Sequence, residues 1–299
     1  MGYQSVIVAN PARLSARNNR LCIDNGETAG IPLEDIRCLM LESAQISLTS
    51  ALLARLAESG ITVFVCDGKH LPKAVFQPVS SHSRQLRQLR LQMNQTLPAK
   101  KRLWRQIVAA KVANQAKCLD LAETAGGKAL RAMVPFIKPG DPQNVEGRAA
   151  AFYFKALFGS DFARDDENEV NAALNYGYAL FRGVAARTLA VYGFEPCLGL
   201  HHASELNNYN LADDLMEPFR PLVDLYVFLN RDTLGGGLTT AVKANLLDLA
   251  NAEVLAGSER HSAAYAVERL VQSLAACLGG QKEGLVLPAL TGLARHEYE

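Results

Sequence analysis

The residues best suited to chemistry lie in one stretch, 198–224, which reads LGLHHASELNNYNLADDLMEPFRPLVD. Two of the six histidines, His201 and His202, precede three acids, Asp213, Asp214 and Glu217. On a helix, residues three or four apart share a face, so Glu217 and the aspartates would repel one another. A divalent cation would reverse that repulsion, and oxygen ligands with one imidazole suit Mg²⁺ or Mn²⁺. The same letters also suit a capped helix with surface acids and two incidental histidines.

A further acid, Glu146, lies in the stretch KPGDPQNVEGRAAAFYF. Asp141 and Pro142 predict the start of a helix, with a capping acid followed by a proline at the first helical position. Ala149 and Tyr153 then fall on the side of Glu146, at spacings of three and seven. Small neighbours would let other groups approach the carboxylate closely. The alternative is an ordinary first-turn glutamate, which the helix dipole favours.

A polar stripe runs along the helix predicted over 167–193. Asn171, Asn175, Tyr178 and Arg182 are spaced so that they occupy one narrow face of a helix. Unpaired buried amides are costly, so such a stripe is either buried with partners, lines a site, or faces solvent.

Basic residues are concentrated in one block. Residues 68–119 contain no Asp or Glu but hold 11 of the 31 basic residues, which leaves 20 basic against 30 acidic residues elsewhere. Such a block indicates a polyanion-binding surface, or a solvated helical face. Arg84, Arg87 and Arg90 recur every three residues beside Leu86, Leu89 and Met93. We therefore expect this leucine and methionine line to pack and the arginines to meet phosphates.

Composition excludes several classes of protein. The 299 residues are 49% hydrophobic, enough for a sizeable core. The six cysteines show no zinc spacing and are typical of buried residues in a reducing compartment. Neither a cleavable signal nor an apolar run of membrane length is recognisable, so we expect a cytoplasmic protein.

The pattern of the chain predicts an α+β protein. A small β-rich N-terminal domain is expected over residues 1–79, with strands in SVIVAN, RLSARNNRLCID, DIRCLMLES, GITVFVCDG and HLPKAVFQPV and a helix in SLTSALLARLAESG. Asn18-Asn19 suits a hairpin turn. PVSSHS, residues 78–83, reads as a linker, and RDTLGGGLTT as a mobile loop. A larger all-α C-terminal domain is expected over residues 80–299, because the hydrophobic period changes to that of helices.

NVEGRAAAFYF, LGLHH and LADDLMEPFRPLVD, in this order, resemble the CRISPR-associated spacer-acquisition integrase, the Cas-one family, and its members from type II systems. The resemblance implies that Glu146, His202 and Glu217 bind one Mg²⁺ or Mn²⁺ ion and are the catalytic residues. His202 ends the G-x-x-H pattern, which leaves His201 as a neighbour. Asp214, Asn175 and Tyr178 are implied as accessory residues of the pocket.

The resemblance also implies an activity and partners. A 3′-hydroxyl of a captured DNA fragment would attack a phosphodiester at the border of a CRISPR repeat, and water in its place would make the same site an endonuclease. The implied assembly is a homodimer joined largely through the β-rich domain, with two such dimers flanking a dimer of a small ferredoxin-like subunit. The residues implied to contact the double-stranded DNA are Arg84, Arg87, Arg90, Lys100, Lys101 and Arg102. A non-catalytic DNA-binding scaffold of the same fold is the alternative.

Overall fold

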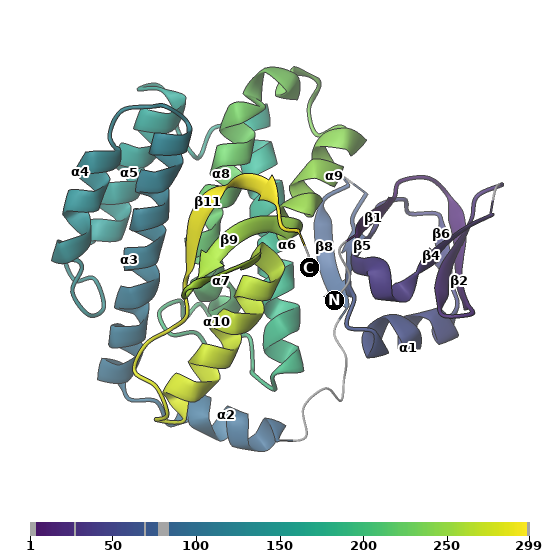
Figure 1. Cartoon of the computed structure of the whole chain (residues 1–299), viewed down its shortest axis with the longest axis horizontal. Helices are drawn as coiled ribbons and strands as arrows, with labels where there is room; N and C mark the ends of the chain where they lie inside the picture. Colours follow the sequence, from purple (N-terminus) through teal and green to yellow (C-terminus); the bar gives the residue numbers. More distant parts are fainter. Residues whose placement is uncertain (1–3, 27, 69, 77–83, 298–299) are drawn as a thin grey trace. The chain divides into compact units, whose positions relative to one another are not determined.

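The structure, a computed structural model, describes residues 4–26, 28–68, 70–76 and 84–297. The chain divides into two compact units, of which the first comprises 1–81 and 239–248 and the second comprises 82–238 and 249–299 (Figure 1). The predicted linker and the predicted boundary after residue 79 fall within 77–83, outside the described residues. No helix in the described ranges combines the length and apolarity needed to cross a bilayer.

The first unit contains two four-stranded sheets, as the sequence led us to expect of a β-rich region. In one sheet the order is β1-β5-β7-β8, with β1, β5 and β7 parallel and β8 antiparallel. In the other the order is β4-β3-β2-β6. The strands are β1 Gln4–Val8, β2 Ala12–Arg17, β3 Arg20–Asp24, β4 Thr28–Pro32, β5 Ile36–Leu41, β6 Ile46–Leu48, β7 Thr62–Cys66 and β8 Pro72–Phe76.

The structure confirms the predicted hairpin turn and the predicted helix of this unit. Asn18 and Asn19 both have positive φ, 48° and 58°, and join β2 to β3 as the hairpin turn that asparagine tolerates. Helix α1, Ser50–Glu58, buries Leu52 and Leu56 in the core of the unit. Gly60 follows its end with a φ of 74°, the conformation in which helices commonly stop.

Helix α9, Thr240–Asp248, groups with the first unit although it lies far along the chain. Its Lys243 Nζ lies 2.5 Å from Glu42 Oε1 at the end of β5, and both side chains are buried. The sequence placed everything after residue 79 in the C-terminal domain, because nothing local indicates that this segment returns. The predicted loop before α9 contains a short 3-10 helix, Arg231–Gly236.

The second unit is rich in helices, and the long helix α3 lies against most of the others (Figure 1). Its N-cap is Thr96, whose hydroxyl accepts the N–H of Ala99. Trp104 of this helix is buried in the core of the unit. The helices are α2 Gln85–Met93, α3 Leu97–Leu121, α4 Gly127–Met133, α5 Val145–Phe158, α6 Glu169–Val191, α7 Asn210–Met216, α8 Arg220–Leu229 and α10 Ala263–Leu278.

The prediction of an all-α C-terminal domain is wrong. This unit also contains a three-stranded antiparallel sheet of order β10-β9-β11, made of β9 Ala252–Ala256, β10 Glu259–Ser262 and β11 Pro288–Arg295. Alternate residues of β9 are buried, so the strand has a period of two. The pattern of β9 spans only five residues, and the short strand β10 and the long helix α10 follow it closely, which is why helical periodicity concealed it.

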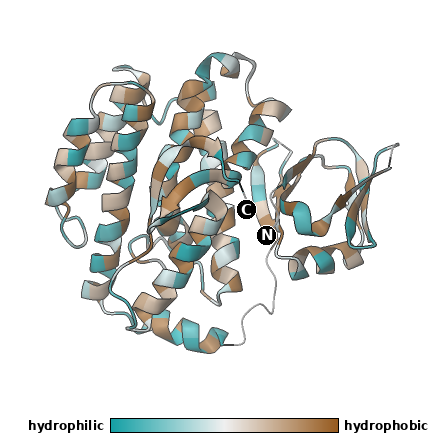
Figure 2. Cartoon of the chain, in the orientation of Figure 1, coloured by the Kyte–Doolittle hydropathy of each residue, from teal (hydrophilic) through white to brown (hydrophobic). Residues whose placement is uncertain are grey.

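The predicted packing of α2 is also wrong. Leu86 and Met93 are exposed, whereas Gln88 and Gln92 are buried. The Gln92 amide makes two hydrogen bonds with the backbone of Glu195. Gln92 Nε2 donates to the Glu195 carbonyl at 3.1 Å, and the Glu195 N–H donates to Gln92 Oε1 at 2.8 Å. Figure 2 shows hydrophilic and hydrophobic residues mixed along this helix. The paired amides rather than the leucine line therefore attach α2 to its unit.

Candidate active site

Two of the three residues predicted as metal ligands meet at one lysine. Lys111 Nζ lies 2.6 Å from Glu146 Oε1 and 2.5 Å from Glu217 Oε2. Lys111 comes from α3, Glu146 from the first turn of α5, and Glu217 from the turn that follows α7. Burial acts to lower the pKa of Lys111, but Glu217 and Glu146 outweigh it and hold that pKa above its usual value. Residues far apart in sequence thus converge on a charged cluster.

Glu217 is buried and has a second cation beside it. Arg220 Nε donates to Glu217 Oε1 at 2.8 Å. Burial favours the neutral acid, but Lys111 and Arg220 outweigh that effect and lower the pKa of Glu217. Oε2 accepts no hydrogen bond of ordinary geometry from the described residues, although the Lys111 ammonium lies next to it. Glu217 is therefore an ionised, buried carboxylate. Its Oε1 accepts a hydrogen bond from Arg220, and its Oε2 faces the Lys111 ammonium.

A buried acid that the sequence reasoning missed lies behind Arg220. Asp224 accepts hydrogen bonds from the hydroxyls of Tyr178 and Tyr153, the latter at 2.9 Å. Burial raises the pKa of Asp224 to about 6. The Arg220 guanidinium lies 4.4 Å from the centre of the Tyr178 ring, so Tyr178 connects Asp224 to the partner of Glu217. Arg220 could have been found from its i+3 spacing to Glu217.

The start of α5 differs in detail from the prediction. Asp141 does cap it, because its carboxylate accepts the N–H groups of Val145 and Glu146 at 2.9 and 2.8 Å. However, the helix begins at Val145, and Asn144 is the N-cap residue, so Pro142 lies before the helix. Glu146 consequently occupies the second helical position, where the helix dipole favours a carboxylate.

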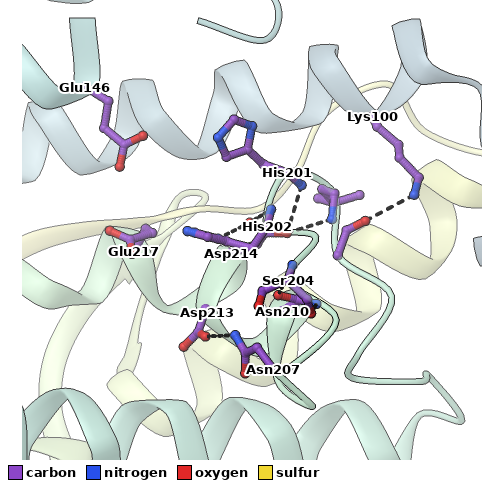
Figure 3. A network of polar contacts seen from close by, with 12 residues as sticks. Lys100, Glu146, His201, His202, Ser204, Asn207, Asn210, Asp213, Asp214 and Glu217 are labelled. Atoms are coloured by element: carbon purple, nitrogen blue, oxygen red, sulfur yellow. Dashed lines mark hydrogen bonds and ion pairs between the residues drawn. The ribbon is translucent and has the colours of Figure 1, made fainter. Parts of the chain in front are cut away.

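Asp214 holds the turn that carries the histidines. Its side chain is fully buried, and Oδ2 accepts the N–H groups of Leu200 at 2.6 Å and His201 at 3.1 Å. Oδ1 accepts the N–H of His202 at 3.2 Å and lies 2.7 Å from His202 Nδ1 (Figure 3). This hydrogen bond outweighs burial and raises the pKa of His202. With Nδ1 directed at Asp214, Nε2 is the ring nitrogen left for other contacts.

Steric contacts explain why the first residue of the G-x-x-H pattern, Gly199, is a glycine. A Cβ on Gly199 would lie 2.2 Å from the carbonyl oxygen of His202 and 3.0 Å from Asp214 Oδ2. Any larger residue would therefore open the turn. Lys100 Nζ donates to the Gly199 carbonyl at 3.1 Å, so this predicted DNA contact helps to hold the turn.

The two histidines have different surroundings. His201 is exposed and stacks on Trp104, with ring centroids 4.3 Å apart and planes within 3°. Figure 3 shows Glu146 and Glu217 with their carboxylates facing each other and His202 next to Glu217. The structure therefore places His202, rather than His201, next to Glu217.

The remaining predicted residues divide between two places. Asp213 is buried and binds Arg182 Nε at 2.6 Å and Asn207 Nδ2 at 2.7 Å. Asn171 is buried with Arg164, which also donates to Asn175 Oδ1 at 2.8 Å. Asn175 is exposed. The side-chain contact that the structure shows for it is with Arg164 and not with Glu146 or Glu217. The stripe on α6 thus has partners along its whole length.

The donor set fits a divalent metal in chemistry, and Lys111 occupies the space between the carboxylates. Two carboxylates and an imidazole are the hard and borderline ligands that suit Mg²⁺ or Mn²⁺. Glu217 Oε2 is a buried oxygen without an aligned donor, as a ligand atom would be. As they stand, no three His, Cys, Asp or Glu side chains within the described ranges are arranged to hold an ion. The residue types therefore suit a divalent metal, while the described arrangement holds Lys111 in that place.

The basic residues predicted to bind DNA are mostly at the surface. Five of the six have exposed side chains, whereas Lys100 is half-buried at the turn described above. The exposed residues are Arg84, Arg87, Arg90, Lys101 and Arg102.

Comparison with known proteins points in one direction. The family described as CRISPR associated protein Cas1 matches residues 6–235. The CRISPR-associated endonuclease Cas1 of Neisseria meningitidis serogroup C (strain 8013) is 40% identical over 304 residues, covering 100% of both chains. A casposase bound to integration product matches 99% of this chain and 94% of its own, with 19% identity and a TM-score of 0.75. A chain of a partial Cas6-RT-Cas1–Cas2 complex matches 96% of this chain and 98% of its own, with 18% identity and a TM-score of 0.62.

Proposed function

Because this chain belongs to the family of CRISPR-associated Cas1 proteins, we propose that it is a metal-dependent DNA integrase and endonuclease of CRISPR adaptation. One observation carries the proposal: Glu146 and Glu217, from different helical segments, face one cation next to His202. Their convergence in a relative of named endonucleases supports a catalytic centre.

The metal would be held by Glu146, Glu217 and the Nε2 atom of His202. When bound, Mg²⁺ or Mn²⁺ supplies a Lewis acid that polarises the scissile phosphodiester and stabilises negative charge on its oxygens. The 3′-hydroxyl of a captured fragment attacks that phosphorus, and the 3′-oxygen at the border of the repeat leaves. One P–O bond forms as another breaks, so no external energy source is required.

The surrounding residues position this centre. Asp214 accepts a hydrogen bond from Nδ1 of His202, which leaves Nε2 as the ring nitrogen that would hold the metal. Arg220 holds one oxygen of Glu217, and Tyr178 holds Arg220 from the other side. Asp214, predicted as an accessory, thus acts through His202, since both of its oxygens already accept hydrogen bonds.

DNA and protein partners belong to the same proposal. Arg84, Arg87, Arg90, Lys101 and Arg102 expose positive charge that would bind phosphates without reading sequence. We infer from family membership that the chain forms a homodimer joined through the β-rich unit. Two such homodimers would assemble with a small ferredoxin-like subunit. The Cas1–Cas2 complex among the structural relatives supports a protein partner.

A strand-transfer assay tests the activity. The substrates are a labelled DNA fragment and a supercoiled plasmid bearing a CRISPR repeat, with Mn²⁺ present. We expect Glu146→Gln and His202→Ala to lower product by at least about 100-fold, because each removes a metal ligand. Asp120→Asn, which changes an exposed acid on α3 paired with Arg131, is the control and should retain activity. Equal product from all four proteins would favour the non-catalytic scaffold.

A further inference from the structure

The carboxylate pair of the proposed site already has a resident cation in this chain. Lys111 lies within 2.6 Å of Glu146 Oε1 and 2.5 Å of Glu217 Oε2, and only 12% of its side chain is exposed. Glu146 and Glu217 carry two negative charges, while Lys111 and Arg220 carry two positive charges. The four side chains therefore form a balanced cluster in the absence of any ion.

A divalent ion cannot simply be added to that cluster. With Lys111 in place, the ion would share the two carboxylates with an ammonium group, and like charges at such distances repel strongly where water is scarce. We propose that Lys111 is the resident counter-ion of the Glu146–Glu217 pair and competes with the divalent metal, which binds when Lys111 swings away. This inference rests on the proposed function, since it assumes that Glu146 and Glu217 are ligands.

Lys111 and Arg220 differ in how firmly they are held. Arg220 donates from Nε to Glu217 Oε1 and also lies over the Tyr178 ring, so two contacts fix its guanidinium. The polar contacts that the structure shows for Lys111 are the two carboxylates themselves. A lysine ammonium is a point charge on a flexible stem and can leave without disturbing the backbone. Lys111 is thus the cation that metal binding displaces.

Metal affinity in the absence of DNA tests the competition directly. Titration of the full-length protein with Mn²⁺, followed by calorimetry or by the electron paramagnetic resonance of free Mn²⁺, measures the dissociation constant. We expect Lys111→Met to bind Mn²⁺ at least about tenfold more tightly than the wild type, within the usual range of coupling between two ligands. Lys117→Met, on the exposed side of the same helix, is the matched control and should leave the affinity unchanged.

A second variant gives a result of opposite sign. Lys111→Arg keeps the charge and adds a bidentate donor, so it should hold the carboxylates more firmly and weaken Mn²⁺ binding. Metal-free Lys111→Met should melt at a lower temperature than the wild type and gain more from added Mn²⁺. If Lys111→Met fails to fold, the comparison of Lys111→Arg with the wild type still decides. Affinities within about twofold of the wild type for the folded variants would overturn the inference.

The ligands provide a separate control. If Glu146→Gln and Glu217→Gln bind Mn²⁺ as tightly as the wild type, the proposed metal site itself is wrong. If both lose Mn²⁺ but the Lys111 variants behave like the wild type, the metal site stands and only the competition is refuted.

Discussion

Asp214 offers the most quantitative test of how the site is built. Its carboxylate is fully buried and accepts three backbone N–H groups and one ring N–H, at 2.6–3.2 Å. Asp214→Asn keeps the shape of the side chain but replaces one carboxylate oxygen by an amide NH₂ group. That group then faces two N–H donors that had been bonded to the oxygen. Hydrogen bonds to a charged group contribute about 1.5–3 kcal/mol each, and the freed donors can reach water in part. We therefore expect a loss of about 2–4 kcal/mol in unfolding free energy.

The chain provides its own probe for this measurement. Trp104 is the sole tryptophan, lies in the second unit, and stacks on His201 within the turn that Asp214 holds. Its fluorescence during urea or thermal unfolding therefore reports on the right part of the molecule. The expected loss corresponds to a decrease in melting temperature of roughly 4–16 °C for a unit of this size.

A comparison with another acid makes the result decisive. Asp120→Asn removes an exposed ion pair with Arg131, and solvent screening leaves such pairs little influence on stability. If Asp214→Asn is no more destabilising than Asp120→Asn, Asp214 does not hold the histidine turn, and the reasoning on His202 loses its basis.

Three further outcomes are expected. Arg84→Glu combined with Arg87→Glu should weaken DNA binding and reduce the slope of log affinity against log salt by roughly 1–2, and curves that overlay the wild type would remove this surface from the DNA path. His201→Ala should retain most strand transfer, whereas His202→Ala should abolish it; the reverse order would show that the wrong histidine was chosen. Burial raises the pKa of Asp224 to about 6, so the folded state binds this proton more tightly than the unfolded state does. The neutral carboxyl therefore adds about 3 kcal/mol to the unfolding free energy below about pH 4, and this contribution is lost as the pH rises to about 6. Asp224→Asn should lack that pH dependence, and parallel stability curves for both proteins would contradict it.

The sequence predicted the family, which is confirmed, and the parts of the fold with strong local signals. The Asn18-Asn19 hairpin and helix α1 depend on turn chemistry and a short apolar period, which neighbouring residues determine. The packing of α2 could not be predicted in this way. Leu86, Leu89 and Met93 share one face of that helix, but the buried amides of Gln88 and Gln92 find partners that only the folded chain supplies.

Lys111 shows the same limit at the site. In the sequence it is one of eleven basic residues in an acid-free block, where a solvated or DNA-binding face is the natural reading. Its neighbours Glu146 and Glu217 lie 35 and 106 positions further along the chain. Only the packing of α3 against α5 and against the turn after α7 brings the three together. A buried carboxylate beside a half-buried one requires positive charge nearby, which is the one signal that could have pointed to a lysine.

The three acids of LADDLMEPF, which looked like one cluster, have three separate roles in the structure. Asp213 pairs with Arg182, and Asp214 accepts the N–H groups of the histidine turn. Glu217 alone faces a cation that can leave, since Lys111 is held by the carboxylates themselves. The repulsion expected among the acids is therefore relieved by three different partners, and a metal is not needed to hold the segment together. It follows that removing divalent ions with a chelator should lower the melting temperature of the wild type by less than that of Lys111→Met, in which no lysine replaces the metal beside the carboxylates. An equal or larger decrease in the wild type would instead mean that the metal, rather than Lys111, is the structural counter-ion of Glu217.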